Sequence, residues 1–343
     1  MAHSMSSTQR IEWMYKNSRD PTEWRAYSDI ETIIIEEAYQ EKQSEALLDD
    51  YHINLKRLLQ VSNQNHTDQC SVQRVIKQRT DSRLREERFM PDPILPSKGF
   101  TDARHRASFL DAAGQCLNLS VLKVSDDTFV TMLVEKAAEG ILSEAKKVGK
   151  EKEGQWMAEQ LLKTKSKSRY EVAKCCARLY CMESFLYKKM NEIMRLGTDE
   201  KYQALWQSKL LTFGPFACLL FNLQRDLSVS ATIQTKTVYR GANFSPEQIK
   251  EYQRITNYSK ADRNYGQFPA FTSTSRNREK AQQFGNILFI IEIGEADGCD
   301  FSLYSEFDEE EHLLAPHFYF SIESCLFDNE INKWVIALRS LNI

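Results

Sequence analysis

The stretch SEFDEEEHLLAP, at residues 305–316, crowds acidic side chains directly against an apolar run. The acids are Glu306, Asp308, Glu309, Glu310 and Glu311. Like charges repel and acids are poor strand formers, so the simple alternative is a solvated acidic loop. If this segment is an extended strand, Glu309 and Glu311 face the same side, about 7 Å apart, while Glu310 points away. We interpret that pair as two carboxylates that each act on one of two positively charged groups in a single reaction.

Two other motifs precede the acids in the same half of the chain, VYRG at 238–241 and FTSTS at 271–275. An arginine at the end of a strand is most often a surface residue, and a Ser/Thr cluster is most often a strand end. Each motif alone is therefore weak. The fixed order and spacing of the two motifs and the acidic segment are a stronger indication of function than any one of them.

Helical periodicity precedes a strand-rich region in the part of the chain that must position these motifs. The predicted helices cover 128–147, 153–165, 170–195 and 210–227. The predicted strands cover 237–241, 268–275, 286–293, 311–315, 317–327 and 333–341. Helices first and strands later in one region predict an α+β domain. Upstream, residues 30–40 resemble a helix and 51–60 a strand, while 81–100 contain three prolines and read as a linker.

Composition is that of an ordinary globular chain, with 343 residues, 42% hydrophobic residues and a formal net charge of -3. This balance demands neither nucleic acid nor a membrane surface as a partner. The start, MAHSMSSTQR, has no apolar leader, so we expect an intracellular protein, cytoplasmic or nuclear. Eight cysteines without a CxxC pair disfavour both a metal site and a disulfide framework. The basic stretch 74–88 is interleaved with acids, which makes nucleic-acid binding unlikely to be its role.

Together, VYRG, FTSTS and EEEHLLAP resemble the arginine–serine–glutamate class of mono-ADP-ribosyltransferases, over residues 175 to 340. The resemblance implies NAD as co-substrate, no metal, and a fold with a helical lobe followed by a split β-sandwich. None of the six histidines precedes a glycine, so the chain lacks the His-Gly opening of the polymer-forming clade.

The resemblance also implies roles for the motif residues. Arg240 would bind the diphosphate, because a planar guanidinium binds such oxygens in a bidentate way. Gly241 would hydrogen-bond the nicotinamide carboxamide, and Ser273 would orient the catalytic glutamate. Glu311 would stabilise the oxocarbenium character that develops when the nicotinamide–ribose bond breaks. Glu309 would position an acceptor arginine and take its proton, since the Glu-x-Glu form marks transfer to arginine.

Upstream, Tyr180, Ser184, Tyr187, Asn191 and Arg195 follow at helical spacing, which places them on one face of a single helix. A solvated face is the alternative. The family has a similar helix along its NAD cleft, which implies that Tyr187 and Asn191 face the ligand. By the same resemblance, Phe284 packs on nicotinamide, although a lone Phe is usually a core residue.

In residues 10–79, the order Trp13, Trp24, Glu36 resembles the WWE module, a mixed sheet with one helix. Such modules bind ADP-ribose units, including those of poly(ADP-ribose), through aromatic rings, a cationic group and directional amides. The matched positions are Tyr15, Arg19, Tyr51, Gln60 and Arg74. The alternative is that the tryptophans are simply core residues and the binding site is vestigial.

The expected organisation is a WWE domain at 10–79, a linker at 80–105 and a transferase domain at 106–343. Within the last, a helical lobe of about 106–230 precedes a β-sandwich core of about 231–343. The expected function is NAD-dependent mono-ADP-ribosylation of arginine in a protein substrate, with ADP-ribose or poly(ADP-ribose) as a second partner and no membrane partner. Two alternatives stay open: an enzyme that mainly hydrolyses NAD, and an idle scaffold that only reads poly(ADP-ribose).

Overall fold

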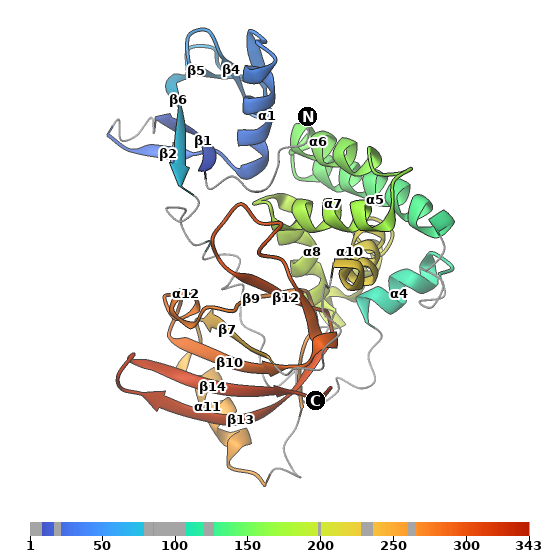
Figure 1. Cartoon of the computed structure of the whole chain (residues 1–343), viewed down its shortest axis with the longest axis vertical. Coiled ribbons are helices and arrows are strands. Elements are labelled where there is room, and N and C mark those ends of the chain that lie inside the picture. Colours follow the sequence, from blue (N-terminus) through green and yellow to red (C-terminus); the bar gives the residue numbers. More distant parts are fainter. Residues whose placement is uncertain are drawn as a thin grey trace.

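The computed structural model describes residues 9–16, 22–78, 85, 108–119, 127–197, 200–227, 236–259 and 265–342. Within these ranges the chain is α+β, as predicted, with one sheet in the N-terminal unit and another at the C-terminal end. Between them lies a group of helices (Figure 1).

The N-terminal unit is a six-stranded sheet packed against helix α1 (Asp29–Gln40), which forms where residues 30–40 predicted a helix. The sheet order is β2-β1-β6-β5-β4-β3. The strands are β1 (Gln9–Lys16), β2 (Trp24–Ala26), β3 (Glu45–Leu47), β4 (Tyr51–Asn54), β5 (Leu59–Ser62) and β6 (Gln69–Gln78). Ser28 and Glu31 form a capping box that begins α1. Trp13 lies fully buried in the core between sheet and helix.

The prediction of one continuous strand over 51–60 is wrong, because the segment folds back on itself between β4 and β5. Leu58 has a φ of 51°, in the left-handed region where such hairpin turns reverse the chain. This reversal places Gln60 on β5 directly opposite Ile53 on β4.

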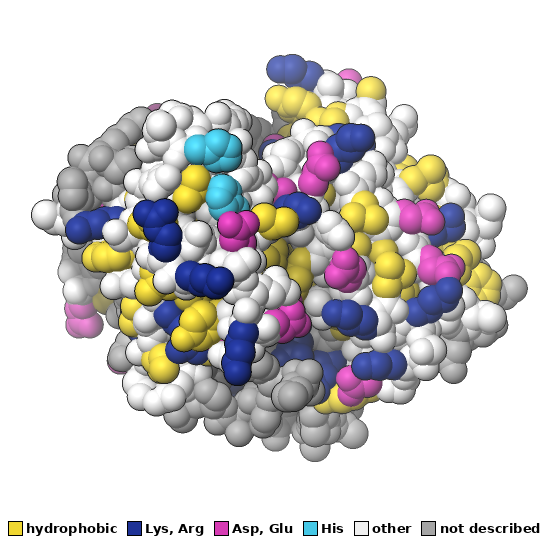
Figure 2. Space-filling model, turned by 90° about the horizontal axis from the view of Figure 1, so that it is seen from above, with side chains coloured by type: hydrophobic (Ala, Val, Ile, Leu, Met, Phe, Trp, Pro, Cys, Tyr) yellow, Lys and Arg dark blue, Asp and Glu magenta, His cyan; other side chains and the backbone are white. Residues whose placement is uncertain are grey.

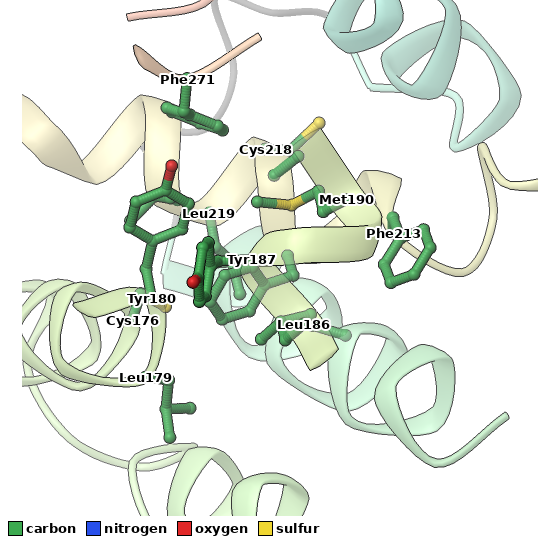
Figure 3. Packing of buried hydrophobic residues seen from close by; sticks show 14 of the residues in the cluster. Cys176, Leu179, Tyr180, Leu186, Tyr187, Met190, Phe213, Cys218, Leu219 and Phe271 are labelled. Carbon is green, nitrogen blue, oxygen red and sulfur yellow. The ribbon is translucent and has the colours of Figure 1, made fainter. Parts of the chain in front are cut away.

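In the helical lobe, α10 packs on both α5 and α7, and α5 also packs on α6. Its elements are α4 (Phe109–Cys116), α5 (Asp127–Lys147), α6 (Glu151–Leu162), α7 (Arg169–Cys181), α8 (Phe185–Leu196), η4 (Glu200–Tyr202), α9 (Gln203–Ser208) and α10 (Gly214–Leu227). Its core holds aromatic and aliphatic side chains from several helices, as the close view in Figure 3 shows. The packed lobe lies beside the strands, where α10 contacts β11.

The C-terminal sheet has the order β11-β12-β9-β7-β10-β14-β13-β8. Its strands are β7 (Lys236–Ala242), β8 (Gly266–Phe268), β9 (Thr272–Ser275), β10 (Ile287–Ile293), β11 (Gly298–Asp300), β12 (Glu311–Leu314), β13 (Phe318–Asp328) and β14 (Lys333–Ser340). The short helices beside them are α11 (Pro246–Thr256), α12 (Arg278–Ala281) and η5 (Glu295–Asp297). The β11-β12-β9 part joins the rest where Tyr239 of β7 pairs with Ser275 of β9, so the sheet is nearly divided in two.

The segment between β11 and β12 carries the acid run and reaches from the sheet toward α7 and the N-terminal unit (Figure 1). On the face of the molecule shown in Figure 2, basic and acidic side chains are interspersed. Such mixing agrees with the small net charge of -3.

Candidate active site

Glu309 and Glu311 are both fully buried, whereas Glu310 between them is partly exposed. The prediction that both lie on one extended strand is wrong. Strand β12 begins at Glu311, and Glu310 has a φ of 48°, so the chain turns between the two carboxylates. The turn still directs Glu310 away from them, because its carboxylate accepts hydrogen bonds from Asn277 at 2.9 Å and Lys280 at 3.1 Å.

These two partners act on the titration of Glu310. The hydrogen bond from Asn277, followed by the bond and positive charge of Lys280, lowers the pKa of Glu310 below its usual value. The lowered pKa favours the charged form of Glu310 on the outer side of the loop.

Arg240 and the FTSTS motif are brought together across the sheet. The Arg240 guanidinium is buried and donates to the backbone carbonyl of Ser273. Ser275, rather than Ser273, lies directly opposite Glu311 in the β9–β12 ladder, and its hydroxyl donates to the Glu309 carbonyl at 2.8 Å. The structure thus links both glutamates to Ser275, a residue that the sequence reasoning did not select.

Gly241 is where the backbone of β7 approaches the segment after α12. A Cβ at Gly241 would lie 2.6 Å from the Ala281 carbonyl oxygen and 2.6 Å from Phe284 Cβ. Only glycine leaves room for that approach. Phe284 itself is buried beside it, at 8% exposure. Gly241 and Phe284, the predicted nicotinamide-binding pair, therefore lie together, and Gly241 follows Arg240 on β7.

The predicted single helix over 170–195 is wrong, because the chain leaves helical geometry after Cys181 and α8 begins at Phe185. Tyr180, Tyr187 and Asn191 nevertheless meet across the break. Asn191 Nδ2 donates to the Tyr180 hydroxyl at 2.8 Å, and the two tyrosine rings lie 6.2 Å apart.

These three side chains are buried, so a solvated face does not describe them. Figure 3 shows Tyr180 and Tyr187 within the packed core, with Phe271 from the strand region near Tyr180, at a ring separation of 5.6 Å. Asn191 Oδ1 is buried and accepts no hydrogen bond within the described part of the chain. An unsatisfied buried acceptor is costly and is a candidate ligand contact.

The end of α7 also contacts the segment that carries Glu309 and Glu311. Cys181 Sγ lies 3.8 Å from a Glu311 carboxylate oxygen, and the Cys181 carbonyl accepts from the side chain of Arg85. Arg85, within the predicted linker, also forms a buried ion pair with Glu309 at 2.5 Å. Sequence reasoning missed both residues, since they are distant in the chain from the motifs they contact and carry no motif of their own.

In the N-terminal unit, the resemblance residues divide into two groups. Trp13 Nε1 donates to the Glu36 carboxylate at 2.9 Å, and Arg74 binds the same carboxylate in a bidentate way at 2.8 and 2.9 Å. Burial tends to raise the pKa of Glu36, but the hydrogen bonds from Arg74, Gln40 and Trp13 outweigh it and lower the pKa. Arg74 is thus already paired.

The second group gathers around Gln60 on β5. Gln60 Oε1 accepts from the hydroxyl of Tyr27 at 2.6 Å, and the Tyr27 ring lies 5.0 Å from that of Tyr15. Tyr51 lies on the neighbouring strand β4. Arg19 lies outside the described residues. Tyr27 was not selected from the sequence, although an aromatic two residues before α1 was the available signal.

Comparison with known families agrees with both resemblances. The family model described as NAD:arginine ADP-ribosyltransferase matches residues 107–342, and the WWE domain model matches residues 11–74. No curated protein sequence matches the chain.

Among solved structures, exoenzyme S from Pseudomonas aeruginosa, in complex with human 14-3-3 protein beta and Carba-NAD, is 15% identical, with a TM-score of 0.40. The match covers 61% of this chain and 89% of that one. The type III effector XopAI from Xanthomonas axonopodis pv. citri is 13% identical over 62% of this chain and 87% of its own, with a TM-score of 0.42. The ADP-ribosyltransferase HopU1 of Pseudomonas syringae pv. Tomato DC3000 is 26% identical, and the match covers 46% of this chain and 65% of HopU1, with a TM-score of 0.35.

The fold and the family match define an ADP-ribosyltransferase, an enzyme class that uses NAD as co-substrate. The chain belongs to the NAD:arginine ADP-ribosyltransferase family and carries a WWE domain at its N-terminal end. Both resemblances noted in the sequence are thereby confirmed.

The described residues contain no helix long and apolar enough to cross a membrane. They also contain no group of three or more His, Cys, Asp and Glu side chains arranged to hold a metal ion.

Proposed function

We propose that this chain transfers one ADP-ribose unit from NAD to arginine side chains of a protein substrate, and that its WWE domain recognises ADP-ribose or poly(ADP-ribose). The observation that carries the arginine assignment is the pairing of Glu309 with a guanidinium, that of Arg85, in bidentate geometry. A carboxylate that binds one guanidinium in this way is suited to bind another.

The donor side of the reaction uses the residues around β7 and β12. Arg240 binds the diphosphate of NAD, and Gly241 and Phe284 hold the nicotinamide. Asn191 offers its buried Oδ1 to a hydrogen-bond donor of the bound dinucleotide. Glu311 is buried, so its charge acts through a low local dielectric on the positive ribose that forms as the C1′–nicotinamide bond breaks.

The acceptor side uses Glu309. A protonated guanidinium is a poor nucleophile, so a guanidine nitrogen must lose a proton as its bond to ribose C1′ forms. Glu309 orients the guanidinium and takes that proton, and nicotinamide leaves with the electron pair of the broken bond. Ser275 supports this arrangement, because its hydroxyl fixes the backbone of the loop at Glu309.

The test is incubation of the full chain with labelled NAD and a mixture of proteins, measuring released nicotinamide and protein-bound label together. Glu311→Gln should lower both by orders of magnitude, because the positive ribose forms in transfer and in hydrolysis alike. Glu309→Gln should lose label on arginine and keep much of its nicotinamide release, since water attacks a reactive cation with little help.

Other outcomes would support the alternatives. Nicotinamide release without label in the wild type would identify an NAD hydrolase. Neither product, with intact ADP-ribose binding, would identify a scaffold. Full arginine labelling by Glu309→Gln would withdraw the assigned role of Glu309 and the arginine acceptor with it.

A further inference from the structure

Arg85 makes a dense set of contacts with the acceptor carboxylate. Its Nε lies 3.1 and 3.2 Å from the two oxygens of Glu309, and its Nη2 lies 2.5 Å from Oε2. The backbone N–H of Arg85 also donates to Glu309 Oε1 at 2.8 Å. The two side chains are 3% and 1% exposed, so the pair is screened from water. Both the charge and the hydrogen-bonding capacity of Glu309 are therefore engaged by a residue of the same chain.

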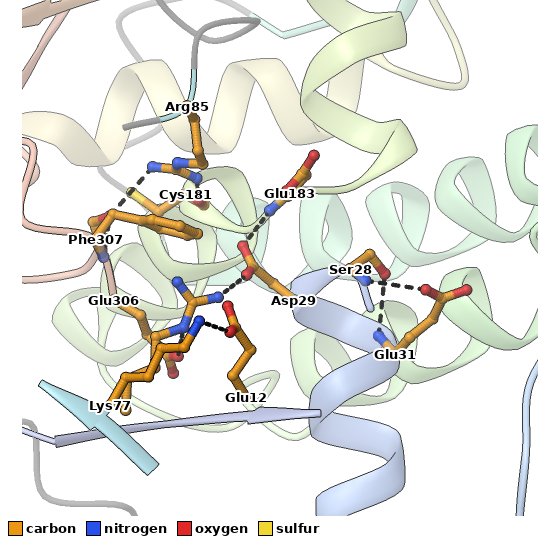
Figure 4. A network of polar contacts seen from close by, with 12 residues as sticks. Glu12, Ser28, Asp29, Glu31, Lys77, Arg85, Cys181, Glu183, Glu306 and Phe307 are labelled. Atoms are coloured by element: carbon orange, nitrogen blue, oxygen red, sulfur yellow. Dashed lines mark hydrogen bonds and ion pairs between the residues drawn. The ribbon is translucent and has the colours of Figure 1, made fainter. Parts of the chain in front are cut away.

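The remaining edges and one face of the Arg85 guanidinium are also held. Nη1 donates to the Cys181 carbonyl, and Nη2 lies 3.3 Å from Ser305 Oγ. The guanidinium carbon lies 3.9 Å from the centre of the Phe307 ring, a cation–π contact. Figure 4 shows Arg85 beside Phe307 and Cys181. Carboxylate, carbonyl, hydroxyl and aromatic face together form a complete guanidinium-binding cage.

The cage is also held from the WWE side. Arg10 of β1 lies 4.0 Å from the centre of the Phe307 ring and 3.8 Å from the Glu306 carboxylate. Arg10 is itself anchored by Asp29 at 2.6 Å. Phe307 thus contacts two guanidinium groups, one from the WWE domain and one from the segment that follows it.

We propose that Arg85 is a built-in pseudosubstrate, which occupies the acceptor-arginine subsite and must leave before a substrate arginine can enter. This inference rests on the proposed function, because it identifies Glu309 as the acceptor carboxylate. It adds three groups to the subsite, namely Ser305, Phe307 and the Cys181 carbonyl, and it assigns an inhibitory role to Arg85.

The contacts favour an inhibitor over a substrate. Attack on ribose requires a guanidine nitrogen that has lost a proton and is directed at C1′. In Arg85, Nε, Nη1 and Nη2 each donate to a protein acceptor, which turns these nitrogens toward the protein. A tethered competitor also acts at an effective concentration on the order of millimolar. The concentration of a free acceptor must therefore exceed this effective concentration before the acceptor can bind.

The test compares wild type with Arg85→Ala and Arg85→Lys, using agmatine as a small guanidine acceptor. Arg57→Ala, which alters an exposed arginine of the WWE domain, is the control. Arg85→Ala should lower the KM for agmatine at least tenfold and leave nicotinamide release without acceptor within about threefold, because Glu311 and Arg240 are unchanged. Arg85→Lys, which keeps a charge without the planar fork, should have a KM for agmatine between those of wild type and Arg85→Ala.

A KM for agmatine that is the same in Arg85→Ala as in wild type would overturn the proposal. The proposal would also be overturned if mass spectrometry of the wild-type chain after incubation with NAD found ADP-ribose on Arg85, because the residue would then be a substrate.

A second measurement does not depend on transfer. Removing Arg85 leaves Glu309 buried without its cation, and agmatine can replace the missing guanidinium. Agmatine should therefore raise the Tm of Arg85→Ala by several degrees and leave that of wild type nearly unchanged. If agmatine raises the Tm of Arg85→Ala but the protein transfers no ADP-ribose, the guanidinium subsite is supported and the proposed function is rejected. Equal shifts in both proteins would reject the pseudosubstrate.

Discussion

Three successive glutamates at 309–311 coexist because each carboxylate has a partner of its own. Glu309 binds Arg85, Glu310 binds Lys280 and Asn277, and Glu311 lies beside Cys181. The turn at Glu310 separates the partners, so like charges do not compete for one cation. A solvated acidic loop would expose all three. Burial of the outer two instead strengthens their electrostatic action on a bound cation.

Arg240 provides a test at the scale of a single side chain. Arg240→Lys keeps the positive charge but removes the planar fork that donates to the Ser273 carbonyl and that we propose binds the diphosphate of NAD. We expect kcat/KM for NAD to fall at least tenfold, about 1.4 kcal/mol, measured by nicotinamide release. Arg339→Lys, on the exposed side of β14, is the matched control and should change little. Unchanged kinetics in Arg240→Lys would remove Arg240 from the NAD site.

At the scale of elements, the strands carrying VYRG, FTSTS and the start of EHLLA could be predicted, because alternation and β-branched residues are local signals. The left-handed turn at Glu310 could not. It is held by tertiary contacts, including the bond from the Arg276 N–H to the Glu310 carbonyl at 3.0 Å. Arg85 was equally hidden, since 224 positions separate it from Glu309.

The break between α7 and α8 shows the same limit. Residues 182–184 contain neither proline nor glycine, and Ser184, the N-cap of α8, makes no side-chain capping bond, so the local signal for a break is weak. The freed N–H groups are satisfied from elsewhere. Glu183 N donates to Asp29 at 2.6 Å, and Phe185 N donates to Glu153 at 2.9 Å. Hydrogen-bond acceptors on other elements stabilise the break, and a local sequence pattern does not reveal them.

The hairpin β4–β5 gives a test of the WWE domain. Gln60→Ala should weaken binding of ADP-ribose to the full chain by roughly 0.5 to 1.5 kcal/mol, because it removes a directional amide and leaves the Tyr27 hydroxyl without its partner. Isothermal calorimetry with ADP-ribose and with short poly(ADP-ribose) is the measurement. Gln78→Ala, at the exposed end of β6, is the control and should bind as wild type does.

For Arg74, the same calorimetric measurement must be interpreted differently. Because Arg74 holds Glu36, Arg74→Ala should lower the Tm whether or not it touches ligand. Weaker binding at a temperature where the variant is fully folded would support Arg74 as a ligand contact. Absence of heat from wild type at millimolar ADP-ribose would end the assignment of this domain as a reader.

At the scale of the whole molecule, the WWE domain docks on the helical lobe through polar contacts (Figure 4). Asp49 accepts from the N–H groups of Lys152 and Glu153 at the start of α6, at 2.6 and 3.4 Å. Trp156 Nε1 donates to Glu37 at 3.0 Å. Asp29 joins the same boundary, since it binds both Arg10 and the Glu183 N–H. The loop that carries Glu309 also contacts the WWE domain, because Arg10 lies against Phe307 and Glu306.

Glu153 makes this boundary sensitive to pH. Burial raises the pKa of Glu153 from its ordinary 4.5 to about 7. The Phe185 N–H and Lys150 oppose the shift, while the charges of Glu31 and Asp49, both in the WWE domain, add to it. In the folded chain this carboxyl keeps its proton up to about pH 7, whereas the unfolded chain releases it near 4.5. Its contribution to the free energy of unfolding therefore falls as pH rises from 4.5 to 7, by about 3 kcal/mol in total, and is constant above.

Glu153→Gln keeps an oxygen for the Phe185 N–H but cannot ionise beside Glu31 and Asp49. Urea unfolding at pH 5 and pH 8 should therefore show the variant gaining on wild type by about 2 to 3 kcal/mol between the two values. Glu159→Gln, on the exposed side of α6, should follow wild type at both. Parallel curves for Glu153→Gln and wild type would mean that the carboxyl does not take up its proton on folding. The gain, if found, places the loss of wild-type stability in the pH range where the unfolded chain has released the Glu153 proton and the folded chain, in which burial raises the pKa of this carboxyl, still holds it.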